Sequence, residues 1–224
     1  RNSFMIKRME DLADRTVWAM GEQLQCGDFV PFVFEHKFNM EVGDGDRKQL
    51  MSGTIDRVDI CENGTDVYVR IIDYKTGKKD FNIVKTYYGI DIQLMVYMEA
   101  AMKLVAKMRP GKNVIPAGVF YYNISDPIVS ATTESAEEIE DKIKGELRLK
   151  GMVNSDKDIA EKMDNTEGTS LNIPVSRKAD GGFDSRRSKV MNTEQFNMLG
   201  RFVDVRAIDT ADRIAGGDIR RSPY

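Results

Sequence analysis

The stretch that decides the fold is residues 53–79, GTIDRVDICENGTDVYVRIIDYKTGKK. Residues 50–60 and 66–75, before and after its centre, are rich in β-branched and apolar side chains, which is typical of strands. Asn63 and Gly64 separate the two segments, and an Asn-Gly pair favours a tight turn between antiparallel strands. The stretch is therefore predicted to form a β-hairpin.

The predicted hairpin gathers two carboxylates and a lysine on one face of a sheet that is otherwise rich in Val and Ile. Side chains alternate between the two faces of a strand, so Asp73 and Lys75 point the same way. With Asn63 and Gly64 as the central turn residues, Asp56 joins them as the diagonal neighbour of Asp73, roughly 7–8 Å away between the backbones. A four-residue turn keeps this arrangement, whereas a three-residue turn breaks it.

Such a cluster is unfavourable unless an ion occupies it, because two adjacent carboxylates repel and one of them gains a proton. Mg²⁺ or Mn²⁺ removes the conflict, since these ions favour carboxylate oxygens and keep some of their waters. Lys75 would then orient the attacking water or neutralise charge in the transition state, which suits phosphodiester hydrolysis. Asp-x-Lys by itself also occurs at solvated strand ends, so the hairpin alone leaves a structural interpretation equally open.

Three motifs together carry a family resemblance: GTIDRVD at 53–59, IIDYKTG at 71–77 and YYGIDIQLMVYM at 87–98. In combination they resemble the nuclease domain of the PD-(D/E)XK superfamily, RecB-like branch. Within that branch the chain is similar to the nuclease domains of AddAB-type bacterial helicase–nucleases, which process double-strand breaks. Weaker similarity extends from about residue 29 to residue 224.

The resemblance implies a role for each matching residue. Asp56 and Asp73 would be metal ligands for Mg²⁺ or Mn²⁺, with the main-chain carbonyl of Tyr74 as a third ligand. Lys75 would be the catalytic lysine. Glu35, within FVFEHKF at 32–38, stands where the family often has a glutamate and would support the metal ligands.

Gln93 and Tyr97 match the family's Q-x-x-x-Y motif, which lies on the helix beside the active site. They are four residues apart and therefore share a helix face, where each side chain would hydrogen-bond a phosphate or a nearby main-chain group. Without the preceding motifs, Tyr97 would be interpreted as a core residue and Gln93 as a surface residue.

Two features that the resemblance implies are absent from the sequence. RecB-like nucleases usually carry a metal-binding histidine on an upstream helix, but the single histidine here, His36, lies in a strand-like segment and is not given that role. AddAB-type domains also hold a 4Fe-4S cluster, with one cysteine upstream and three near the C-terminus. Cys26 and Cys61 lack C-x-x-C spacing, so no cluster is expected, and both absences predict an excised fragment of a longer chain.

The composition is that of an ordinary globular chain with no overall basic field. The 224 residues are 41% hydrophobic and 31% charged, with a net charge of −3, so DNA contacts would have to use local basic patches. Residues 76–79 with Lys85 form one such rim, as phosphate contacts or as a solvated turn; loop 176–189 is another, with mobility favoured over DNA contact. No apolar run approaches the roughly 18–20 residues of a membrane span and no signal peptide is found, so a bacterial cytoplasmic location is expected.

Hydrophobic periodicity orders the chain up to residue 123 as αβββαβ. This predicts an α/β fold, a mixed central sheet flanked by helices, in agreement with the restriction-endonuclease-like core of the family. One domain over 1–224 is expected, with a core at about 29–123 and a C-terminal elaboration at 124–224. Helices are predicted over 4–25 (Met5 and Met9 buried), 83–108 (Ile90 buried), 135–149 and from Thr193, strands over 29–42, 50–60, 66–75, 115–123 and 171–175, and a turn at 43–46.

The leading hypothesis is a metal-dependent DNA exonuclease domain that cleaves a single strand delivered by a helicase, in a protein that works with an AddA-type subunit. One alternative is a nuclease-fold module that guides DNA or acts as a scaffold without cleaving it. A third is an unrelated metal-binding α/β domain, against which the Q-x-x-x-Y helix argues.

Overall fold

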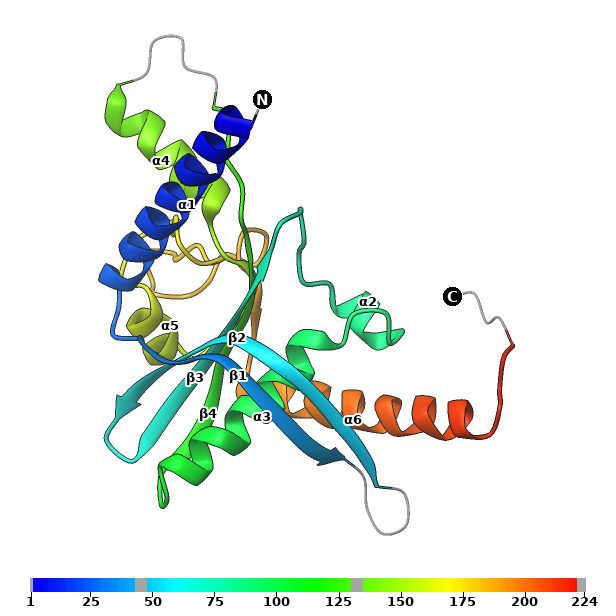
Figure 1. Ribbon diagram of the computed structural model, residues 1–224. Helices are drawn as coiled ribbons and strands as arrows, with labels where there is room; N and C mark the ends of the chain where they lie inside the picture. The colour runs from blue at the N-terminus through cyan, green and yellow to red at the C-terminus, as the bar shows by residue number, and fades with distance from the viewer. Residues whose placement is uncertain (1, 43–47, 130–134, 221–224) are drawn as a thin grey trace.

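A six-stranded mixed sheet runs through the middle of the molecule in the order β1-β2-β3-β4-β5-β6, with helices on both faces (Figure 1). The structure, a computed structural model, describes residues 2–42, 48–129 and 135–220. The β3–β4 and β5–β6 pairs are parallel, and the other neighbours are antiparallel. The predicted α/β class is confirmed. The strands are β1 (Val30–Val42), β2 (Gln49–Asn63), β3 (Asp66–Lys75), β4 (Asn113–Asn123), β5 (Lys150–Asn154) and β6 (Val190–Met191).

Helices divide between the two faces of the sheet, and each face has its own hydrophobic core. One core lies under α3 and α6, and the other lies under α1, α4 and α5 (Figure 1). Among the described helices, none is both long and apolar enough to cross a lipid bilayer. The helices are α1 (Asn2–Gln25), α2 (Ile83–Tyr87), α3 (Gln93–Met108), α4 (Ala136–Leu147), α5 (Lys157–Met163) and α6 (Thr193–Ala215).

The β2–β3 hairpin forms as predicted, but its turn is displaced by one residue. Asn63 pairs with Asp66, so Gly64 and Thr65 are the central residues, and the prediction of Asn63 and Gly64 is wrong. Gly64 has a φ of 59°, and a type II′ turn requires a positive φ at its first central position, which glycine supplies. The new register keeps every side chain on its predicted face, because it shifts the pairing by two residues.

The predicted helix over 83–108 is interrupted. Asn82 caps α2 by accepting hydrogen bonds from two backbone N–H groups of its first turn, and Gly89, with a φ of 74°, follows the end of α2. A left-handed residue ends an α-helix, and glycine adopts it readily. As a result Ile90, expected to be buried, is 46% exposed, and α3 begins afresh at Gln93.

Other differences lie at the edges of the fold. Met5 and Met9 of α1 are exposed rather than buried, because only the C-terminal part of this helix, around Ala19, packs on the core. Residues 171–175 form no strand, although Ile173 and Val175 are buried. The short strands β5 and β6 were not predicted, and the expected turn at 43–46 lies outside the described residues.

Gly53, the glycine of the G-x-I-D motif, leaves room for two aromatic rings. A Cβ at this position would lie 2.9 Å from Cε1 of Phe38 and 3.4 Å from Cε1 of Tyr97. Phe38 is buried in the core that α3 covers, so its ring cannot move away without disturbing that core. The motif glycine therefore fixes how closely β2 approaches the ring of Tyr97.

We expect Gly53→Ala to destabilise the fold by about 1–3 kcal/mol, the usual cost of overpacking a core. Chemical unfolding in urea measures this difference. The matched control is Gly77→Ala, because a Cβ at Gly77 meets nothing within 4 Å. Equal stability of the two variants would contradict the packing role assigned to Gly53.

Candidate active site

Asp56, Asp73 and Lys75 meet on the sheet face that α3 covers. Asp73 is 2% exposed, and its Oδ2 lies 2.6 Å from the Nζ of Lys75. Asp56 lies on the adjacent strand, where its Oδ2 accepts a hydrogen bond of 2.7 Å from the main-chain N–H of Tyr74. The two carboxylates directly follow the last pair of the hairpin ladder, Arg57 with Ile72. They are therefore closer than the predicted diagonal arrangement.

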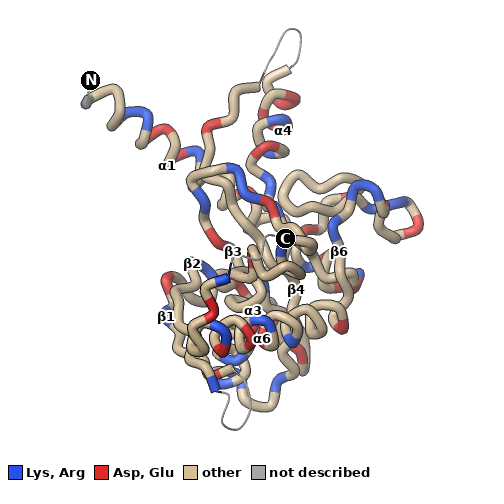
Figure 2. The backbone as a smooth tube through the Cα atoms, turned by 90° about the vertical axis from the view of Figure 1, so that its right-hand side faces the viewer, with Lys and Arg blue, Asp and Glu red and all other residues tan. Residues whose placement is uncertain are grey.

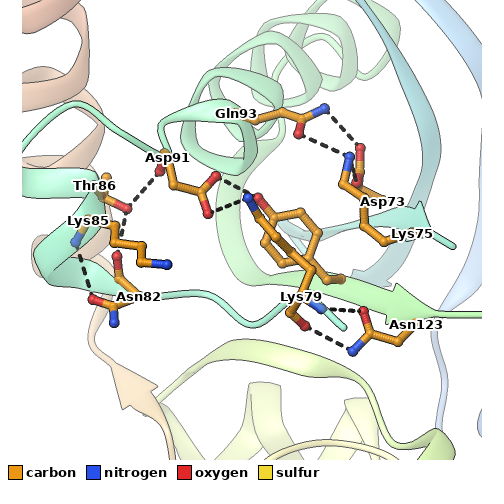
Figure 3. A network of polar contacts seen from close by, with 10 residues as sticks. Asp73, Lys75, Lys79, Asn82, Lys85, Thr86, Asp91, Gln93 and Asn123 are labelled. Atoms are coloured by element: carbon orange, nitrogen blue, oxygen red, sulfur yellow. Dashed lines mark hydrogen bonds and ion pairs between the residues drawn. The ribbon is translucent and has the colours of Figure 1, made fainter. Parts of the chain in front are cut away.

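Gln93 connects the acid and the lysine through its side-chain amide. Its Nε2 donates to Asp73 Oδ1 at 3.1 Å and to the hydroxyl of Tyr97 at 2.9 Å, and its Oε1 accepts from Lys75 Nζ at 3.2 Å. Figure 3 shows the amide of Gln93 directed at both partners from the start of α3. One amide thereby sets the relative orientation of the carboxylate and the ammonium group.

Tyr97 completes the group one helical turn further along α3. Its ring packs edge-on against Phe38, with ring centroids 5.8 Å apart and an interplanar angle of 80°, which is a favourable aromatic geometry. Its hydroxyl is the second acceptor of Gln93. The structure thus brings the predicted residues Asp73, Lys75, Gln93 and Tyr97 into one hydrogen-bonded unit.

Burial dominates the electrostatics of Asp73. Loss of water raises the pKa of its carboxyl group above the ordinary value, while the hydrogen bond and charge of Lys75 lower it, and the charge of Asp56 raises it again. The unbound site is therefore electrostatically strained, because a buried carboxylate faces a second carboxylate with one ammonium group between them and the solvent.

The donor set fits a small, hard divalent ion. Asp73 Oδ2 is buried and has no hydrogen bond of acceptable geometry among the described residues, although Lys75 lies close to it. No group of three His, Cys, Asp or Glu side chains suited to a metal is found in the described part of the chain. An ion held by two carboxylates keeps several waters or takes substrate oxygens, which is the usual coordination of Mg²⁺. The role of the Tyr74 carbonyl stays a prediction.

Glu35 lies beside Asp56 on the neighbouring strand, in an unusual backbone conformation. Its neighbours Phe34 and His36 pair with Arg57 and Ile55, so Glu35 is level with Asp56. Its φ is 47°, a region that non-glycine residues rarely occupy and that often marks functional sites. The side chain is exposed, and no hydrogen bond or ion pair joins it to another described residue. The supporting role predicted for Glu35 stays a prediction.

The sequence did not single out a second acid–lysine pair beside this group. Asp91, two residues before Gln93, lies with its Oδ2 2.9 Å from Lys79 Nζ and accepts a hydrogen bond from Tyr121 through Oδ1. Figure 3 shows the Lys79–Asp91 pair next to Asp73, Lys75 and Gln93. The basic rim predicted around Lys79 was the only signal for it, because Asp91 belongs to no recognised spacing.

Basic and acidic positions alternate over the described chain rather than forming one continuous basic surface (Figure 2). The predicted basic loop 176–189 is anchored at its start. Arg177 donates hydrogen bonds to the main-chain carbonyls of Thr166, Ala160 and Asp164, so its guanidinium is committed to holding the loop. The Ser188 hydroxyl is bonded to the backbone of Ser176, which argues against a freely mobile segment.

A mixed sheet that carries an acid on each strand of a hairpin, a lysine two residues after the second acid and a supporting glutamine defines a class of nuclease. A sequence profile of the PD-(D/E)XK nuclease superfamily matches residues 1–224. The chain belongs to this superfamily.

The curated relatives are narrower in kind, each being the B-type subunit of an ATP-dependent helicase/deoxyribonuclease. The protein of Clostridium botulinum strain Hall is 34% identical over 235 aligned positions, and that of Lachnoclostridium phytofermentans is 36% identical over 234. The protein of a Thermoanaerobacter species is 34% identical over 235. Each match covers 100% of this chain and 20% of the relative. The resemblance to AddB, the second subunit of AddAB-type enzymes, is confirmed, and the chain spans a fifth of the length of these relatives.

We expect Asp73→Asn to raise the melting temperature of the metal-free protein at pH 7. A carboxyl group whose pKa is raised on folding stabilises the protein below its unfolded-state pKa, and that contribution is lost as the pH rises through the folded-state pKa. The advantage of the variant should therefore shrink as the pH falls towards about 4. Thermal unfolding in EDTA at both pH values measures it.

Mn²⁺ provides the control for this prediction. The ion should raise the melting temperature of the wild type by mass action and have a much smaller effect on Asp73→Asn. A lower melting temperature for Asp73→Asn at pH 7 without metal would show that the contacts with Lys75 and Gln93 outweigh the burial of the charge.

Proposed function

We propose that this chain is a divalent-metal-dependent deoxyribonuclease domain that hydrolyses DNA phosphodiester bonds. One observation supports this most strongly: the buried Asp73 carboxylate is held by Lys75 and Gln93 and lies beside Asp56. Such a group is stable chiefly as a ligand for a cation, and a cation beside a lysine suits phosphoryl chemistry. The domain comprises residues 1–224, with its core at about 29–123.

Each residue of the site has a distinct task in the proposed hydrolysis. Asp56 and Asp73 hold Mg²⁺ or Mn²⁺, which when bound lowers the pKa of a coordinated water and offsets charge on a phosphoryl oxygen. The Tyr74 N–H fixes one oxygen of Asp56 and leaves the other for the ion. Lys75 is 30% exposed at its side chain, so its ammonium reaches the reacting phosphate while Gln93 limits its rotation.

Tyr97 and Gln93 act by positioning. The Tyr97 hydroxyl takes one of the two amide protons of Gln93, and Asp73 takes the other. The amide oxygen is then left to face Lys75, so the ammonium group is oriented before substrate arrives. Preorganised charge of this kind stabilises a transition state without reorganisation during the reaction.

The whole-protein context follows from the relatives named as helicase/deoxyribonuclease subunits. The domain would cleave as an exonuclease on a single strand that the helicase delivers, during double-strand-break repair and recombination in the bacterial cytoplasm. An AddA-type helicase–nuclease subunit would be its partner. The absence of a third acidic, histidine or cysteine ligand among the described residues favours one competing proposal, a scaffold that binds DNA without cleaving it.

We expect Asp73→Ala to abolish Mg²⁺- or Mn²⁺-dependent cleavage of end-labelled single-stranded DNA. Lys75→Ala should lower kcat by about 100- to 1000-fold, the usual effect of removing one preorganised charge. Gel analysis of the products with a label at either end also gives the polarity of cleavage.

The matched control is Asp66→Ala, at the opposite end of the same strand, which should cleave like the wild type. Equal cleavage by the wild type and Asp73→Ala would refute the assignment. DNA binding without cleavage at every Mg²⁺ and Mn²⁺ concentration would support the scaffold instead.

A further inference from the structure

We propose that Lys79 is a second substrate-binding cation, held by the buried Asp91–Tyr121 pair so that it binds a DNA phosphate next to the one cleaved. This inference rests on the proposed nuclease function and adds to it a residue outside the Asp-x-Lys and Q-x-x-x-Y motifs. The contact identifies its ligand by chemistry, as a phosphodiester oxygen of a single strand that crosses the site.

Asp91 is placed to hold an ammonium group. It is 7% exposed, and Tyr121 is fully buried. The Tyr121 hydroxyl donates to Asp91 Oδ1 at 2.8 Å, and burial together with Asp91 as acceptor raises the pKa of Tyr121, so the hydroxyl keeps its proton. This bond leaves Oδ2 to Lys79, whose Nζ lies 2.9 Å away. A buried carboxylate needs such a charge partner.

The main chain of Lys79 is fixed as firmly as its ammonium group. The Asn123 side chain, at the end of β4, accepts a hydrogen bond of 3.0 Å from the Lys79 N–H and donates one of 2.9 Å to the Lys79 carbonyl. Figure 3 shows Lys79 held by Asn123 at its backbone and by Asp91 at its tip. The side chain is thereby prevented from swinging into solvent, as a lysine in an open turn would.

Lys79 keeps binding capacity that Lys75 has already used. An ammonium group has three N–H donors. Lys75 is engaged by Asp73 and Gln93, whereas Asp91 is the single charged partner of Lys79 among the described residues. The side chain of Lys79 is 40% exposed, compared with 5% for Asp91. The acid is enclosed and the ammonium faces outward, which is the arrangement required to present a positive charge to a ligand.

The position of Lys79 relative to the proposed catalytic group identifies which ligand this is. The Nζ atoms of Lys75 and Lys79 lie 5.6 Å and 5.4 Å from the ring centroid of Tyr121, so both ammonium groups approach the same buried ring. The charge of Lys79 also lowers the pKa of Asp73. A strand whose phosphate is at Lys75 would therefore pass Lys79 with a neighbouring phosphate, and a lysine binds phosphate as a point charge.

The test measures binding of a fluorescein-labelled oligothymidylate by anisotropy, over a range of NaCl concentrations and with Ca²⁺ in place of Mg²⁺. Lys79→Ala should raise Kd several-fold at low salt and reduce the slope of log K against log salt by about 0.7, the value for one phosphate contact with a single strand. Asp91→Asn keeps an acceptor for Tyr121 but removes the charge that holds the ammonium, so it should raise Kd as well.

The matched control is Lys107→Ala, an exposed lysine in the last turn of α3, far from Gln93 at the first. It removes the same charge and should leave the slope unchanged. If Lys79→Ala lowers the melting temperature but leaves Kd and the slope as in the wild type, Lys79 is purely structural and the proposal fails.

The outcomes also separate this proposal from the nuclease assignment. A wild type that binds DNA through Lys79 but never cleaves it would sustain the phosphate contact and refute the nuclease activity. A wild type that cleaves, with the KM of Lys79→Ala unchanged, would sustain the activity and refute the phosphate contact.

Discussion

The buried carboxylate of Asp73 is the constraint on which the rest of this structure depends. A charge that is 2% exposed requires compensation, and the chain supplies it from β3 through Lys75 and from α3 through Gln93. The interruption between α2 and α3 serves the same end, because it places Gln93 at the very start of a helix that lies across the sheet. A continuous helix would not set that residue there.

The opposite face of the hairpin holds a charge cluster of a different kind. Asp59 is fully buried and accepts hydrogen bonds from both nitrogens of the Arg57 fork, at 2.6 and 2.8 Å, and from Arg70 at 2.9 Å. Asp59 and Arg70 are directly paired across β2 and β3. A slip of the register would separate this buried pair, so the cluster on one face keeps Asp56 next to Asp73 on the other.

Sequence patterns predicted what short-range physics controls. Alternation placed Asp56, Asp73 and Lys75 on one face, and the error in the turn left that result intact, because a two-residue shift preserves the side-chain period. The break at Gly89 was missed because apolar residues continue through it at helical spacing. Asp91 and Tyr121 were missed for another reason: they meet through the parallel pairing of β3 with β4 and the path of the chain after α2, which no local pattern encodes.

The central claim is that Asp56 and Asp73 form the cation site of the chain. Calorimetric titration with Mn²⁺ tests it most directly, on the wild type and on the double variant Asp56→Ala/Asp73→Ala, with thermal unfolding as the check that both proteins are folded. We expect the wild type to bind Mn²⁺ and the folded double variant to show no binding heat. Equal binding by both proteins, or no binding by the wild type, would contradict the claim.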